Sequence, residues 1–264
     1  MNIFKATTLL SLFCAMLLCS CSLDEWNNKK YTKTTYIVDF YKMEGIDVET
    51  ERVLIDSVFY SQIRIYPSRN VQSVASMYDD DLHLFYQCCD EHGDANYCNR
   101  EIPKMEMPPL FTASYLADDI KKIELVSCET WDEAHPSGAS LNDLAYLVGF
   151  SIQPFIDKGY EKYDYSSHVQ SEFFYSVFKD YKNQGLREWY PIDKPLSKIT
   201  SEDMRCMGWG APGTVIDTWP GKKHDLGSCL ATLILPYPER MDSINVKVIL
   251  TNCADEVYEV SASL

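Results

Sequence analysis

The sequence predicts a mainly β domain, most simply an antiparallel β-sandwich with two inserted helices, and leaves an α+β arrangement as the alternative. Three observations favour this class. Short runs that alternate apolar and polar residues recur along the chain, residues 244–264 can pair as a hairpin with one wholly apolar face, and only two segments have helical spacing. An immunoglobulin-like sandwich is one candidate form, because it combines short alternating strands with turns.

The first segment of the chain has the features of an export signal. Its apolar run over 9–18 is too short to span a bilayer as a stable helix, and polar, acidic residues follow it. The run ends in Leu18-Cys19-Ser20-Cys21, which resembles the bacterial lipobox, where the chain is cut just before a cysteine that carries lipid. An ordinary cleaved signal peptide and an N-terminal membrane helix are the alternatives.

Cys21 suits lipidation better than Cys19, because Ser20 supplies the small residue before the cut. We therefore expect a lipoprotein signal peptide over 1–20 and a lipid on Cys21 that anchors the protein to a membrane. The polar residues of the segment 21–34 are expected to form a flexible tether.

A single β-rich domain is expected over 35–264. Alternation indicates a strand over 36–41 and a long strand-like run over 53–66, which Pro67 ends. Shorter strand candidates are 83–86 and 122–126. Three prolines exclude 102–110 from a central strand or a helix interior.

Two segments have helical spacing. Ser140 is placed as an N-cap, apolar residues follow it at helical intervals, and Gly149 is placed to end the helix. The second helix is expected to begin at Ser167, which forms a capping-box pattern with Gln170, and to end near Gly185. The aromatic block at 173–175 also suits a strand.

The C-terminal residues give the clearest register. Folded as an antiparallel hairpin around Ala254, they place four apolar pairs on one face. A slip by one residue would destroy that face. A third strand over 230–235 is expected beside the hairpin. The expected pairs are Leu250 with Tyr258, Val248 with Val260, Val246 with Ala262 and Ile244 with Leu264.

Charge narrows the range of partners. The chain has a net charge of −15 and no cluster of lysine and arginine residues. Such a chain repels phosphate backbones, so we expect no nucleic-acid partner. The expected partners are the membrane, through the lipid anchor, and a glycan or a protein.

Seven cysteines follow Cys21, so at least one thiol stays unpaired or bonds between molecules. We expect a disulfide from Cys88 or Cys89 to Cys98, because it would close a short loop in an oxidising compartment. These cysteines and His92 could together form a metal-binding motif, but their spacing matches none of the usual zinc patterns. No metal ligands and no cofactor are therefore assigned.

Other motifs are weak. Gly208–Gly213 matches GxGxxG, but it lacks the preceding apolar strand and is predicted to be a turn. Asp79, Asp80 and Asp81 suit a solvated loop better than a calcium site. His135 lies near two acids and is expected to be a loop residue rather than a metal or acid–base group. No catalytic residue is assigned.

The segments 123–127, 131–138 and 140–144, together with the ending from Leu230, resemble uncharacterised lipoproteins of Bacteroidetes. The residues just after Cys21, Ser-Leu-Asp-Glu, also resemble the acidic surface-export signal of such lipoproteins. The resemblance implies a β-rich protein of the cell envelope, at the outer membrane, on its surface or periplasmic face. It implies no catalytic residues.

The expected function is that of a non-enzymatic binding or structural module on a tether. The alternatives are a glycan-binding component of carbohydrate uptake, a fimbrial-type subunit and an unrecognised hydrolase. An exposed aromatic row would favour glycan binding, a long exchangeable edge strand would favour assembly, and paired acids in a cleft would favour hydrolysis.

Overall fold

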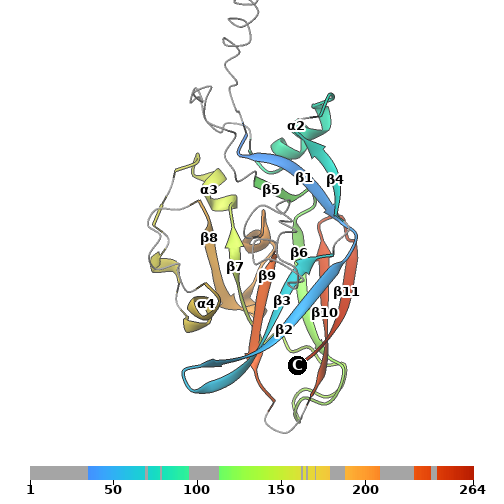
Figure 1. Cartoon of the computed structure of the whole chain (residues 1–264), viewed down its shortest axis with the longest axis vertical. Helices are drawn as coiled ribbons and strands as arrows, with labels where there is room; N and C mark the ends of the chain where they lie inside the picture. Colours follow the sequence, from blue (N-terminus) through green and yellow to red (C-terminus); the bar gives the residue numbers. More distant parts are fainter. Residues whose placement is uncertain are drawn as a thin grey trace, which may run out of the picture.

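The computed structural model describes residues 35–68, 71–77, 79–94, 113–161, 163–164, 166–169, 171–178, 188–208, 229–238 and 243–264. Over these ranges strands dominate, and they form three sheets (Figure 1). The mainly β prediction is confirmed. Within the same ranges, no helix has the length and apolar character that a bilayer crossing requires.

The largest sheet has five strands in the order β2-β3-β9-β7-β8, and each adjacent pair is antiparallel. Strand β9 lies in the middle, and its first five residues are all buried, as a central strand covered on both faces requires. The strands are β2 (Ile46–Ile55), β3 (Val58–Pro67), β7 (Tyr146–Ser151), β8 (Tyr190–Pro195) and β9 (Ala231–Pro236).

Two sheets of three strands complete the β structure. One has the order β11-β10-β6 and is antiparallel; the other has the order β4-β1-β5, in which β1 and β5 run parallel. The strands of the first are β6 (Ile120–Ser127), β10 (Asn245–Asn252) and β11 (Val257–Ser263). Those of the second are β1 (Ile37–Met43), β4 (Val71–Ser76) and β5 (Ala113–Leu116).

The C-terminal hairpin has the register that its alternation predicts. Val248 pairs with Val260 in the β10–β11 ladder, and the pairs predicted for Leu250 and Val246 form in the same ladder. The end of the hairpin is closed by two backbone hydrogen bonds between Ile244 and Leu264. Val246, Val248 and Leu250 are completely buried, so the predicted apolar face is the one that packs inward.

A sandwich forms where this hairpin sheet faces the five-stranded sheet. Their apolar side chains share one cluster, in which Val248 and Leu125 from one sheet join Leu147 and Leu233 from the other. One side of the sandwich is closed where β2 lies beside β11, and there Thr50 Oγ1 donates a hydrogen bond to the Ser263 carbonyl, 3.0 Å away.

The prediction of a third strand was right about the strand and wrong about its neighbours. Residues 230–235 give rise to β9, but β9 lies in the five-stranded sheet between β3 and β7. The strand beside the hairpin is β6, which pairs with β10. Alternation within a strand defines its faces but not its partner, and continuous burial of β9 suits a central position.

The first predicted helix, over 140–149, is wrong. Ser140 forms an isolated bridge with Val126, and the chain then turns and enters β7. Gly149 lies inside that strand, where an added Cβ would be 3.4 Å from the side chain of Met207. The apolar residues recur at intervals that suit a helix, but buried pairing of β7 with β8 and β9 prevails over this short pattern.

The second predicted helix is shorter than expected. Helix α4 covers Glu172–Val177, and its N-cap is Ser171, whose Oγ accepts a hydrogen bond from the amide of Phe174. The expected cap Ser167 lies in a 3₁₀ turn, while Gln170 and Gly185 fall outside the described residues. The other short helices are α3 (Gln153–Asp157), η1 (Ser166–His168), η3 (Leu196–Lys198) and η4 (Glu202–Met204).

The predicted strand at 83–86 is wrong, because helix α2 covers His83–Glu91. Phe85, Cys88 and Cys89 are its buried residues, at the spacing of one helix face. The short apolar run at the start of the helix is equally compatible with a strand, which is the known ambiguity of such runs.

Candidate functional site

The run predicted over 53–66 is a hairpin, since β2 and β3 meet at a two-residue turn. Asp56 and Ser57 have φ angles of 47° and 67°, which are typical of the turns that match the twist of paired strands. Aspartate is among the non-glycine residues that adopt positive φ most readily. The sequence therefore does contain a turn residue at Asp56. The alternation of apolar and polar residues continues across the turn, however, so the two strands resemble a single one.

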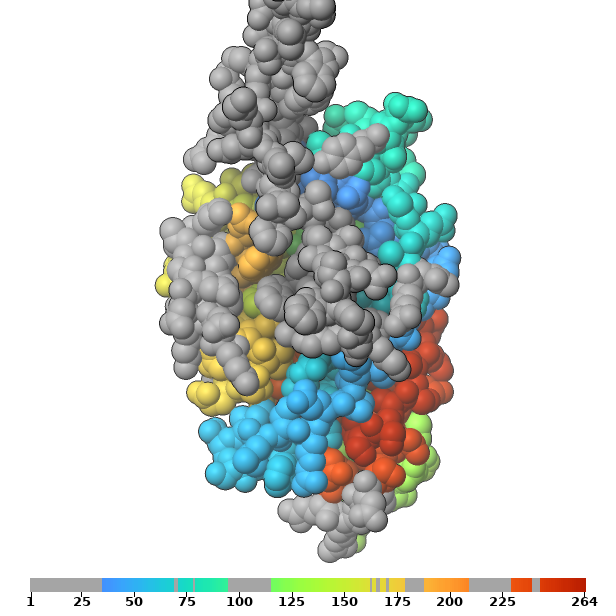
Figure 2. All heavy atoms as spheres, in the orientation of Figure 1, coloured from blue at the N-terminus to red at the C-terminus, as the bar shows by residue number. Residues whose placement is uncertain are grey.

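The outer face of this hairpin carries exposed apolar and aromatic side chains around an arginine. Leu54 and Phe59 are cross-strand partners and are 61% and 48% exposed. The Arg52 guanidinium lies 4.0 Å from the ring centroid of Phe59 and 4.1 Å from that of Tyr237. We call Arg52, Leu54, Phe59 and Tyr237 the hairpin patch. Figure 2 shows the hairpin segment, in light blue, at the surface beside the red C-terminal strands.

The opposite face of the hairpin holds the patch in place. Ile55 is buried in a cluster with Phe174 of α4, and Tyr60 packs edge-on against Phe173 at 5.0 Å. The Tyr237 amide also donates to the Phe59 carbonyl at 3.1 Å. The patch is therefore presented by a supported hairpin rather than by a free loop.

His135 is held between two carboxylates. Its Nδ1 lies 2.8 Å from Asp132 Oδ1, and its Nε2 lies 3.1 Å from Asp143 Oδ2. The side chain of His135 is only 12% exposed, and Asp132 also accepts from the amide of Ala134. The sequence identified the histidine and the nearby acids but did not identify Asp143 as its second partner.

The hydrogen bonds of this group indicate a structural role. Both ring nitrogens of His135 face carboxylates, so neither is turned toward a ligand or a substrate proton. Hydrogen bonding to Asp132, and then to Asp143, raises the pKa of His135 above its ordinary value. The hydrogen bond from His135 lowers the pKa of Asp132. The arrangement joins the loop at 131–138 to the chain that enters β7, which agrees with the expected loop role.

We expect the pKa of His135 to lie above 6.5 in the folded protein. Because the folded value is raised, the stabilisation that protonation brings is fully present below pH 6.5 and is lost as the pH rises through the folded value. NMR titration of the imidazole protons measures this pKa. Asp132→Asn is expected to lower it more than Asp143→Asn, and an unchanged pKa in both variants would contradict the proposed contacts.

The predicted cysteine bridge falls partly outside the described residues. Cys88 and Cys89 are buried on α2, whereas Cys98 is not described. No disulfide joins the six cysteines that the structure does describe. Burial raises the pKa of the Cys88 thiol, and burial together with Asp94 raises that of Cys89. Thiols with raised pKa values are weak nucleophiles at neutral pH.

The acidic run at 79–81 lies in the loop before α2. Asp79 accepts from the Ser76 amide at 2.7 Å, and Asp81 accepts from the His83 amide at 2.9 Å. These two carboxylates therefore hold the turn into the helix.

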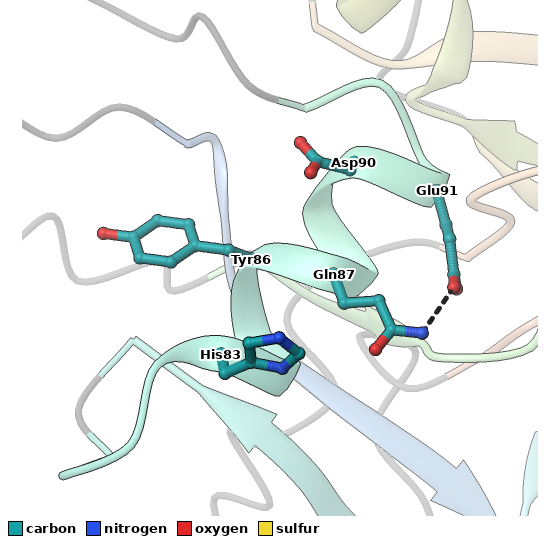
Figure 3. A pocket seen from close by; sticks show the side chains of 5 residues that line it. All are labelled: His83, Tyr86, Gln87, Asp90 and Glu91. Atoms are coloured by element: carbon teal, nitrogen blue, oxygen red, sulfur yellow. Dashed lines mark hydrogen bonds between the residues drawn. The ribbon is translucent and has the colours of Figure 1, made fainter.

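A hollow lies along the exposed side of α2. It is lined by His83, Tyr86, Gln87, Asp90 and Glu91 (Figure 3). Figure 3 shows the carboxylates of Asp90 and Glu91 pointing in different directions, and Glu91 accepts from Gln87 Nε2 at 3.1 Å. The two acids are therefore not arranged as a catalytic pair.

Three further predictions concern residues outside the described ranges. They are the lipid site Cys21 with its tether to residue 34, the proline segment 102–110, and the Gly208–Gly213 turn beyond Gly208. Comparison with family models, curated proteins and solved structures found no significant match to this chain.

Proposed function

We propose that this chain is a lipid-anchored protein of the bacterial cell envelope whose β domain binds a protein partner and is not an enzyme. The hairpin patch carries this proposal. Exposed Leu54 and Phe59 flank an arginine that lies against two rings. Aromatic residues and arginine are the types most enriched in the centres of protein interfaces.

The position of the hairpin patch supports a binding surface that faces away from the expected membrane anchor. The expected lipid on Cys21 and the tether to residue 34 precede β1, which is the first described strand. In Figure 1 the dark blue start of β1 and the β2–β3 turn lie toward opposite ends of the long axis. A lipid at the start of the chain would therefore leave the hairpin patch accessible to a partner outside the membrane.

The described residues offer less support for the alternatives. The exposed aromatic residues Phe59, Tyr86 and Tyr163 come from three separate segments, whereas glycan binding would favour a row. The long strand β2 has β11 beside it, which limits its use as an exchangeable edge in a fimbrial-type assembly. Asp132 and Asp143 do lie close together, but His135 occupies the space between them.

A site-specific photo-crosslinker tests the binding surface in intact cells. Placed at Phe59, it is expected to trap one defined protein, and Leu54→Ser in the same chain should reduce the yield strongly. Loss of a central interface side chain weakens binding by about 30-fold when it contributes about 2 kcal/mol. The matched control is a crosslinker at Val257, which is 57% exposed on β11. Equal trapping at both positions, or none at Phe59, would refute the hairpin patch.

The anchor is tested in the same cells with Cys21→Ala. We expect this variant to lose the label from a fatty-acid analogue and to leave the membrane fraction, because the lipid alone holds the chain there. Label retained by the variant would contradict lipidation at Cys21. The crosslinking experiment and the anchor experiment test separate claims, because a chain released from the membrane can still be crosslinked to its partner.

A further inference from the structure

Three potential metal ligands from distant parts of the chain meet beside α2. They are His92, just after that helix, Asp119, just before β6, and Cys206, which follows η4. One nitrogen, one oxygen and one sulfur atom lie within 4.8 Å of one another. His92 and Cys206 are buried, and the Asp119 side chain is 14% exposed.

The imidazole of His92 is oriented for ligation. Its Nδ1 lies 2.8 Å from the Cys88 carbonyl oxygen, which can only accept, so Nδ1 carries a proton. In the neutral ring, Nε2 then offers a lone pair. His92 is 3% exposed, and its Nε2 has no hydrogen-bond partner among the described residues. A backbone carbonyl that holds the far nitrogen is the usual support for a metal-binding histidine.

The other two groups are held against this nitrogen. Asp119 Oδ1 lies 3.6 Å from His92 Nε2, and it accepts from the Cys206 amide at 2.6 Å. Cys206 has a φ of 44°, a conformation that non-glycine residues rarely adopt and that tends to occur at functional sites. Its Sγ donates to Gln153 Oε1 at 3.2 Å, and Gln153 Nε2 donates in turn to the His92 carbonyl.

We propose that His92 Nε2, Asp119 Oδ1 and Cys206 Sγ bind one zinc ion, with Gln153 Oε1 or water in the fourth position. Zinc accepts nitrogen, oxygen and sulfur ligands in a tetrahedron, whereas calcium and magnesium require oxygen. On binding, the Cys206 thiol loses its proton to water, and the sulfur forms a bond to the metal ion. Zinc–ligand bonds of about 2.0–2.3 Å would draw the three ligand atoms, which lie within 4.8 Å of one another, closer together.

The charges around the cluster favour two competing states, one with a bound cation and one with a protonated His92. Arg205 Nε lies 3.8 Å from Asp119 Oδ2, so its positive charge faces the oxygen turned away from His92. The negative charges of Asp94 and Asp157 act on Cys206 and favour a cation there. Without a metal, the competing state is a protonated His92 paired with Asp119, whose Oδ1 lies 3.6 Å from Nε2.

Zinc binding by the full chain, purified in detergent and stripped of metal, tests the proposal. One zinc ion per chain is expected, measured by native mass spectrometry and by competition with a chromogenic chelator. His92→Gln and Cys206→Ser should each weaken zinc binding by at least about 100-fold, since loss of a mere supporting residue costs about 10–100-fold. Cys229→Ser is the matched control, because Cys229 is also a buried thiol and donates to the Ala231 carbonyl.

Cobalt gives a second readout that does not depend on the variants folding. Cobalt bound to Cys206 should show thiolate-to-metal charge-transfer absorption in the unmodified chain. If Cys206→Ser does not fold, this absorption decides alone. The proposed site would be overturned if the band is absent or if the unmodified chain takes up no zinc. It would also be overturned if Cys206→Ser retains zinc while Cys229→Ser loses it. The result is independent of the hairpin patch.

Discussion

Val248→Asp is expected to destabilise the domain by about 3–5 kcal/mol, a large part of a typical stability of about 5–15 kcal/mol. Val248 is completely buried and lies between Val260 of β11 and Leu125 of β6. A carboxylate there would have apolar neighbours from both sheets of the sandwich, and the described residues of that core cluster include no cation. Urea denaturation of the chain expressed without residues 1–21 measures the loss.

The neighbouring residue provides the control for Val248. Lys247 lies on the opposite face of β10, is partly exposed, and forms an ion pair with Glu259 at 3.0 Å. Lys247→Asp is expected to cause a far smaller loss, because exposed ion pairs contribute little. Equal losses in the two variants would show that the facing of β10 is wrong.

Asp94→Ala is expected to cost roughly 2–4 kcal/mol, since each unsatisfied buried donor costs about 1–3 kcal/mol. Asp94 is fully buried, and its carboxylate accepts from the Tyr36 amide at 2.8 Å and from the Ile37 amide at 2.7 Å. It also accepts from the Tyr160 hydroxyl at 2.8 Å. The substitution removes an acceptor that fixes the start of β1, and urea denaturation of the same chain measures its cost.

Two further variants test whether the loss of stability in Asp94→Ala comes from the missing hydrogen bonds and depends on burial. Asp94→Asn keeps one acceptor oxygen and should lose less stability than Asp94→Ala. Asp79→Ala also removes an acceptor from a backbone amide, that of Ser76, but Asp79 is exposed and water can replace it. A loss at Asp79 as large as that at Asp94 would contradict the argument from burial.

Local sequence predicted those parts of the fold that depend on one strand and its near neighbour. The C-terminal hairpin is the clearest case, because two alternating runs joined by a short turn have few ways to bury one face. The strand at 122–126, found as β6, and the strand at 36–41, found as β1, follow the same logic. His135 was likewise placed in a loop from nearby residues alone.

Longer-range pairing decided the rest. Residues 141–149 have helical spacing, yet Leu147 and Val148 enter a strand because β8 and β9 offer pairing on both sides. Residues 230–235 form a strand whose neighbours, β3 and β7, come from far earlier in the chain. Propensity acts over a few residues, whereas sheet order depends on which apolar faces can be buried together.

The candidate sites divide in the same way. The sequence by itself determined the mainly β class and the hairpin register, because each depends on residues close together in the chain. For the same reason it predicts an export signal with a lipid on Cys21. Only the tertiary structure placed Tyr237 beside Arg52, or gathered His92, Asp119 and Cys206 around one point. Their proximity comes from the packing of sheets and helices, and the spacing of these residues along the sequence does not predict it.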